Sequence, residues 1–127
     1  MQKLARYNPD KPRAVGWSSL SEGEQIDLVE EAHRKERLDP SARRLHAATH
    51  VVVENQILLG DSTPVAEALE RLQRGGLSRH DAVHAIGSVL AEHVLEIVQE
   101  VRPGDPSADY YEAIRNLTVE SWYASFS

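Results

Sequence analysis

Four of the six histidines fall into two HxxxH pairs, which is the pattern in this sequence that most directly suggests chemistry. The pairs are His46 with His50 and His80 with His84. Random placement of histidines at this composition would produce only about 0.3 such pairs. Residues four apart in a helix lie one turn apart and about 40° apart around the axis, so both imidazoles of a pair project to one side. Two helices that each carry such a pair can converge on one metal ion.

Glu54 extends the first pair into an HxxxHxxxE stripe. Val53 and Ile57 lie within about 20° of His46 on the helical wheel, which places the stripe in the apolar sector of its helix. A buried polar group must be hydrogen-bonded or coordinated, because leaving it unpaired costs about 1–3 kcal/mol. We therefore predict a metal site in which Glu54 is a ligand or a general base. Its predicted ligands are His46, His50, Glu54, His80 and His84.

The donor types narrow the choice of metal and of reaction. Imidazole and carboxylate ligands without thiolate suit Zn, Fe, Mn or Ni, and the chain contains no cysteine. An ion with open coordination positions either lowers the pKa of a bound water toward 7 or carries out redox chemistry. The pattern therefore favours a metal-dependent hydrolase or oxidoreductase.

An alternative interpretation needs no metal. Buried imidazoles can form a hydrogen-bond network in a structural or interaction protein. The isolated His33 and His93 are interpreted in this way, as core residues or helix-end partners, and His93 points about 180° away from His84 on a straight helix. Arg79 is interpreted as a surface residue that could also hold an anionic substrate. Three further carboxylates, those of Asp81, Glu92 and Glu96, could orient imidazoles. For Glu92 and Glu96 a surface position is favoured.

Helix-capping patterns and breaks divide the chain into the elements that must position these residues. Prolines, glycines and capping residues predict helices over 22–37, 40–59, 65–74, 79–101 and 106–120. No segment shows the period-two alternation of a strand. We therefore predict a compact all-α bundle of four to five helices over 18–127, with the histidine-rich core at 40–101. Residues 1–17 are predicted to form an arm, anchored by Tyr7 and Trp17.

Composition excludes several function classes. The 127 residues carry 14 Lys and Arg against 20 Asp and Glu, a net charge of −6, which argues against a basic nucleic-acid-binding surface. No apolar run approaches the roughly 20 residues of a membrane helix, and no secretory signal is recognisable, so we expect a cytoplasmic protein. The aromatic C-terminal tail, 122–126, is expected to dock on the domain or to pair with a second copy in a homo-oligomer.

The histidine pairs and their surroundings resemble a small bacterial helical family of unknown function. The resemblance is carried by His46-Ala-Ala-Thr-His50, which continues into the Val-Glu-Asn-Gln of 53–56, and by the stretch 71–87 with Gly76-Leu77-Ser78-Arg79-His80. It implies that His46, His50, Glu54, His80 and His84 form one constellation. It implies no known reaction.

Two better-understood families share fragments of the pattern. His50xxxGlu54 followed by His80xxxHis84 is similar to the ligand spacing of hemerythrin-like bundles, which hold two irons. Here a short extra helix intervenes, and no later histidine is followed by an aspartate four or five residues on. The dyad His80-Asp81 resembles, more loosely, that of the HD-domain phosphohydrolases.

Overall fold

The fold is known from a computed structural model, which describes residues 7–13, 16–33, 39–98 and 106–124. Every regular element within these ranges is a helix, so the all-α prediction is confirmed. The helices are α1 (Glu22–Ala32), α2 (Pro40–Leu58), α3 (Val65–Arg74), α4 (Arg79–Val98), α5 (Pro106–Asn116) and α6 (Val119–Ala124). Short 3-10 turns occur at Trp17–Ser19 and Gly60–Ser62. None of the described helices is long and apolar enough to cross a membrane.

The helices begin at the capping residues that the sequence predicts. Ser21 and Glu24 form a reciprocal capping box at the start of α1. Asp39 accepts a hydrogen bond from the backbone N–H of Ala42 at the start of α2, and the hydroxyl of Ser78 accepts one from Asp81 at the start of α4. The first helix ends at Ala32. Residues 34–37, over which this helix was predicted to continue, lie outside the described residues. The same holds for residues 99–101, the predicted end of the fourth helix.

The prediction of one helix over 106–120 is wrong, because the chain breaks after Asn116 and starts again as α6. Thr118 and Ser121 exchange hydrogen bonds between side-chain hydroxyl and backbone N–H, which caps the new helix. The break also buries Leu117 in the core. Trp122 of α6 packs against the larger of the two apolar clusters described below, whereas Tyr123 is exposed. Residues 125–127 of the predicted aromatic tail lie outside the described residues.

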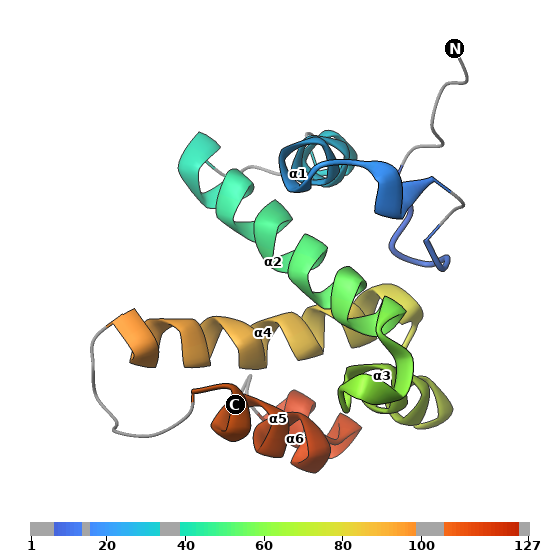
Figure 1. The fold of residues 1–127 in the computed structure, drawn as a ribbon. Helices are drawn as coiled ribbons and strands as arrows, with labels where there is room; N and C mark the ends of the chain where they lie inside the picture. Colours follow the sequence, from blue (N-terminus) through green and yellow to red (C-terminus); the bar gives the residue numbers. More distant parts are fainter. Residues whose placement is uncertain (1–6, 14–15, 34–38, 99–105, 125–127) are drawn as a thin grey trace.

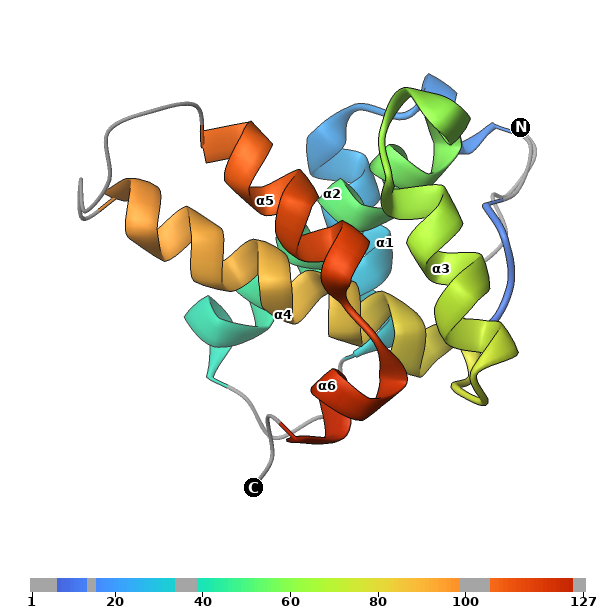
Figure 2. The same cartoon turned by 90° about the horizontal axis from the view of Figure 1, so that it is seen from below.

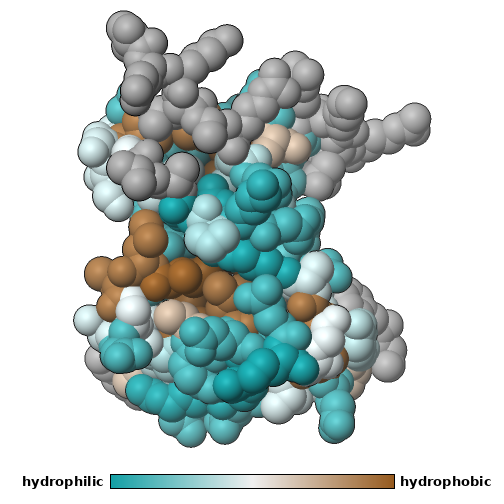
Figure 3. All heavy atoms as spheres, turned by 90° about the vertical axis from the view of Figure 1, so that its right-hand side faces the viewer, coloured by the Kyte–Doolittle hydropathy of each residue, from teal (hydrophilic) through white to brown (hydrophobic). Residues whose placement is uncertain are grey.

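The six helices are arranged around α2 and α4. In Figure 1, α1 lies across one side of α2, α4 crosses its other side, and α3, α5 and α6 lie beyond α4. Figure 2 shows α5 along α4, with α3 beside them. Figure 3 shows a waist between the α1 side and the α3–α6 side, with apolar side chains gathered at it.

Two apolar clusters correspond to this division. The smaller one joins the N-terminal segment and α1 to α2, and its buried members are Tyr7, Trp17, Val29, Ala47 and Val51. The larger one lies between α2, α3, α4 and α5 and includes Val53, Leu72, Val83, Ile86 and Ile114. The histidine-bearing face of α2 lies between the two clusters, so both contribute to positioning it.

A glycine turn sets the start of α4. The N–H of Leu77 donates to the carbonyl of Leu72, and that of Gly76 donates to the carbonyl of Gln73, the pattern of a Schellman motif. Gly76 has a φ of 111°, a conformation that L side chains rarely adopt. Both leucines are buried in the larger cluster. The turn therefore fixes where Arg79 and His80 begin α4.

Replacing Gly76 with alanine is expected to lower the free energy of unfolding by about 1 kcal/mol or more, because a Cβ is strained at positive φ. The matched control is Gly23→Ala in α1, where the Cβ meets nothing closer than 4.0 Å and the helix gains about 0.5 kcal/mol. Urea unfolding of both variants checks the prediction. Equal effects of the two substitutions would contradict it.

Candidate metal centre

Five histidines from three helices gather where the end of α1 and the first turns of α4 meet the middle of α2. The ring centroid of His33 lies 4.7 Å from that of His46 and 4.7 Å from that of His50. His80 and His84 are 4.3 Å apart, and His84 lies 4.8 Å from His50. Three segments remote in sequence thus place their imidazoles at one point.

Four of these histidines are close enough to share one metal ion. One ligand nitrogen from each of His33, His50, His80 and His84 lies within 4.8 Å of the others. The Nε2 atoms of His80 and His84 are 3.2 Å apart. A tetrahedral site with metal–nitrogen bonds of about 2.0–2.1 Å has ligand nitrogens about 3.3 Å apart. This pair therefore already has the spacing of two ligands of one ion.

Hydrogen bonds on the outer side of two rings, those of His33 and His50, show which nitrogen of each ring carries a proton. His33 Nδ1 lies 2.8 Å from the carbonyl oxygen of Val29. A carbonyl only accepts, so Nδ1 carries a proton, and Nε2 is the atom with the lone pair when the ring is neutral. His33 is thus both the C-cap residue of α1 and a member of the cluster.

Tyr7 makes the same assignment for His50. The Tyr7 hydroxyl donates to Glu54 Oε2 at 2.8 Å, so it can only accept from His50 Nδ1, which is also 2.8 Å away. His50 Nε2 is therefore the unprotonated nitrogen. The residue is only 2% exposed, and its Nε2 finds no hydrogen-bond partner among the described residues. A buried acceptor of this kind is what a coordinated ion would satisfy.

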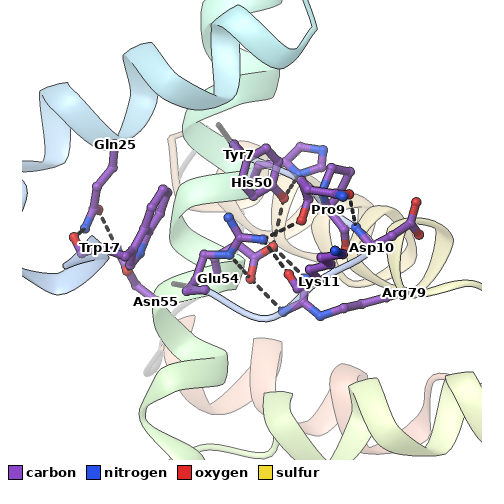
Figure 4. A network of polar contacts seen from close by, with 12 residues as sticks. Tyr7, Pro9, Asp10, Lys11, Trp17, Gln25, His50, Glu54, Asn55 and Arg79 are labelled. Carbon is purple, nitrogen blue, oxygen red and sulfur yellow. Dashed lines mark hydrogen bonds and ion pairs between the residues drawn. The ribbon is translucent and has the colours of Figure 1, made fainter. Parts of the chain in front are cut away.

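Glu54 is the centre of a buried ionic network beside the histidines (Figure 4). Arg79 donates to both of its oxygens, at 2.9 and 2.8 Å, and Arg13 Nε lies 3.3 Å from Oε1. Glu54 is fully buried and Arg79 nearly so. The carboxylate therefore reaches the histidine cluster through the Tyr7 hydroxyl.

The N-terminal segment 7–13 crosses this network and is tied to α4. The carbonyl of Pro9 accepts from Arg79 at 2.9 Å, and Asp10 Oδ1 accepts from the backbone N–H of His80 at 3.2 Å (Figure 4). The Arg13 guanidinium lies 4.1 Å from the centre of the Tyr7 ring. The segment therefore covers the ionic network and holds the start of α4 in place.

Burial and the neighbouring imidazoles keep His50 and His84 neutral. Burial, followed by the nearby imidazole of His84, lowers the pKa of His50 to about 2. Burial, with His80 as the next cause, lowers the pKa of His84 to about 4. Burial and the negative charge of Glu54 raise the pKa of Tyr7 above its ordinary value. At neutral pH the imidazoles of His50 and His84 therefore offer lone pairs, and the Tyr7 phenol keeps its proton.

A cavity of about 330 Å³ opens beside the cluster. His46, His50 and His84 line one end of it. The rest of the wall is formed mainly by small or apolar side chains from α2, α4 and α6, namely Ala42, Leu45, Thr49, Val83, Gly87, Ser88, Ala91 and Trp122. A molecule in this cavity would lie against the histidines.

The site differs in membership from the set predicted from the sequence. His50, His80 and His84 come together as ligand candidates, and His46 lies beside them, 5.0 Å from His84 between ring centroids. His33, interpreted as an isolated residue, joins the group. Glu54 instead engages its oxygens with arginines and Tyr7. Its roles as metal ligand and general base stay predictions.

The sequence contained a signal for His33 that depends on topology. His33 lies six residues before Asp39, and His46 lies six residues after Pro40, so the two histidines are equally far along the chain from the break at Asp39-Pro40. Two antiparallel helices joined at this break bring such equidistant positions together.

The interpretation of Arg79 as a surface residue is wrong, because it is 6% exposed and paired with Glu54.

The other polar residues considered in the sequence lie outside the group of ligand atoms. His93 bonds to the carbonyl of Val89 and contacts Tyr110, away from the cluster as predicted. Asp81 and Glu92 are exposed, and the side chain of Glu96 lies outside the described residues.

No protein-family model, curated protein or solved structure matches this chain. The resemblances noted in the sequence therefore remain expectations, and the site is interpreted from its own geometry.

Glu54→Gln is expected to lower the free energy of unfolding by about 3–5 kcal/mol, because it leaves the Arg79 and Arg13 guanidinium groups buried without their carboxylate. Chemical denaturation measures this loss. The control is Glu67→Gln, which breaks the exposed ion pair of α3 with Arg71 and should cost less than about 1 kcal/mol. A cost for Glu54→Gln as small as that of the control would contradict the role assigned to the network.

The metal-free protein is expected to lose stability in mild acid. The unfolded chain protonates histidines below about pH 6.5, whereas the folded chain resists protonation of His50 and His84 until the pH approaches their lowered pKa values. Stability is therefore full above about pH 6.5 and declines as the pH falls toward 4. We expect a loss of about 2 kcal/mol for each of the two groups, or about 4 kcal/mol in total, between pH 7 and pH 5, measured by denaturation with a chelator present.

Two variants separate this effect from general acid sensitivity. His84→Asn should weaken the dependence on pH, whereas His93→Asn, outside the cluster, should leave it unchanged. Identical pH profiles for wild type and His84→Asn would show that the cluster is not its source.

Proposed function

We propose that this chain binds one divalent transition-metal ion through His33, His50, His80 and His84, and that the ion is the centre of a metal-dependent enzyme. The observation that carries the proposal is the proximity of four ligand nitrogens, all within 4.8 Å of one another. Two of the rings have their Nδ1 protons engaged outside the cluster, which leaves Nε2 available for coordination.

The donors suit a borderline transition metal. Imidazole binds Zn, Fe and Ni well, and the carboxylate of Glu54, which belongs to the ligand set predicted from the sequence, suits Mn. Four neutral imidazoles would leave the full positive charge on the ion, which strengthens its action as a Lewis acid or its hold on an anion. Thiolate-selective chemistry is excluded because the chain has no cysteine.

The ionic network supports this proposal as a positioning device. Tyr7 holds the His50 ring in one tautomer, and Glu54 holds the Tyr7 hydroxyl. A chain of hydrogen bonds behind a coordinating histidine fixes its orientation and raises its basicity. Glu54 is thereby a positioning residue in the proposed site.

The cavity supports a catalytic rather than a purely structural ion. A structural zinc site is closed by its four ligands, whereas a catalytic site keeps an accessible position. Four imidazoles alone would close a tetrahedral site, so a catalytic ion here needs a fifth position. The cavity lined by His46, His50 and His84 is the side from which a water or substrate could reach that position. We propose that His46, at the mouth of the site, hydrogen-bonds this incoming group. Water activation by the ion would give a hydrolase, and a redox metal would give an oxidoreductase.

A second candidate is a metal-free hydrogen-bond network in a structural or interaction protein. It is favoured by the contact of 3.2 Å between His80 Nε2 and His84 Nε2, which is also a hydrogen-bond distance. In neutral imidazoles one of these nitrogens would donate and the other accept. The two candidates differ in metal content.

Elemental analysis of untagged protein, purified without chelators or immobilised metal, tests the proposal. We expect about one ion of Zn, Fe, Mn or Ni per chain in the wild type. His33→Asn and His84→Asn should lose the ion, whereas His93→Asn, a histidine of the same helix as His84, should retain it. Tyr7→Phe should bind the ion about 10–100-fold more weakly, because it removes the acceptor for His50 Nδ1.

The outcome also distinguishes the two candidates. Circular dichroism must show that each variant is folded before its metal content is compared. A wild-type protein that carries no ion, even after dialysis against each of the four metals, would refute the metal site and leave the hydrogen-bond network as the function of the cluster.

A further inference from the structure

A second, apolar cavity lies between α2 and α4, next to the cavity beside the histidines. This second cavity has a volume of about 440 Å³ and shares Leu45, Thr49 and Ala91 with the first. Its remaining lining consists of Ala48, Val52, Leu90 and Val94. It follows the first half of α2 and the second half of α4, whose courses can be traced in Figure 1. Together the two cavities form one elongated site.

The chemistry of this elongated site changes from one end to the other. At one end lie three imidazoles, including the buried His50 with its unbonded Nε2. At the other end the described lining residues are aliphatic, and none of those lining either cavity carries a formal charge. The hydroxyls of Thr49 and Ser88 donate to carbonyls of their own helices, at 3.0 Å each. The two hydroxyl protons of the wall are therefore already engaged within their own helices.

Large apolar side chains are exposed along the same site. Leu45 is 68% exposed and Val94 is 46% exposed, on facing helices. A contiguous exposed apolar surface next to a polar centre is typical of a ligand site. A ligand that buried these side chains would gain hydrophobic free energy in proportion to the area covered.

We infer that the elongated site binds a small amphiphile, with an anionic or neutral metal-coordinating head at the histidines and an alkyl chain between α2 and α4. The inference rests on the proposed function, because the head requires the ion. Neutral imidazole ligands leave the positive charge of the ion uncompensated, which favours an anionic head such as a carboxylate. Leu45 and Val52 are seven residues apart, about 10 Å along the helix, which suits a chain of medium length. The substrate class is thus a medium-chain acyl compound.

The experiment compares two hydroxamates that share a head but differ in the chain. The protein is loaded with Co²⁺, whose visible absorption reports coordination of the head, and is titrated with octanohydroxamate and acetohydroxamate. We expect octanohydroxamate to bind at least about tenfold more tightly, because its additional methylene groups leave water for the apolar cavity. The fluorescence of Trp122, which lines the first cavity, provides a second signal.

A matched pair of variants locates the chain. Ala48→Asp places a charge in the second cavity only and should abolish the preference for the longer chain, while acetohydroxamate binding is retained. Ala108→Asp makes the same change at an exposed alanine in the first turn of α5 and should preserve the preference. Circular dichroism and metal content confirm that both variants are folded and loaded.

The outcomes separate this inference from the proposal on which it rests. If the protein holds cobalt but binds the two hydroxamates equally, the amphiphile inference is overturned and the metal site stands. If neither the wild type nor any variant holds the ion, the proposed function itself has failed, and the inference fails with it. If Ala48→Asp converts a dimer into a monomer in sedimentation experiments, the groove is an interface between copies and the inference is overturned.

Discussion

The burial of one carboxylate constrains the rest of this structure. Glu54 has no exposed surface, and a bare charge in such a place would cost far more than a small domain can tolerate. Arg79, Arg13 and Tyr7 make the burial possible, and they come from α4 and from the N-terminal segment. Satisfying this charge therefore requires three remote parts of the chain to meet at one point, which is beside the histidine cluster.

The same network links stability to the chemistry of the site. Because Tyr7 must donate to the carboxylate, it can only accept from His50, and the other nitrogen of that imidazole then faces the cluster without a proton. His33 Nδ1 is likewise engaged outside the cluster, by the carbonyl of Val29 in α1. The neutral, oriented lone pair of His50 is thus built into the metal-free fold, and it depends on a buried charge whose loss would destabilise the domain.

Much of the fold was predictable from the sequence because its signals are local. The capping residues Ser21 and Asp39 and the glycine turn at Gly76 act within a few residues, so the starts of α1 and α2 and the end of α3 follow from them. The break before α6 was missed. Its cause is the combination of a cap at Thr118 with burial of Leu117, and that burial depends on packing.

The sequence by itself determined that two helices each present a pair of imidazoles on one face, because the four-residue spacing and the helical period require it. Only the tertiary structure decided which groups share the site. The antiparallel hairpin of α1 and α2 brought in His33, and the N-terminal segment drew Glu54 into an ionic network with a buried Arg79. Spacing fixes direction along one helix, whereas proximity between helices depends on how buried charges and apolar faces are satisfied together.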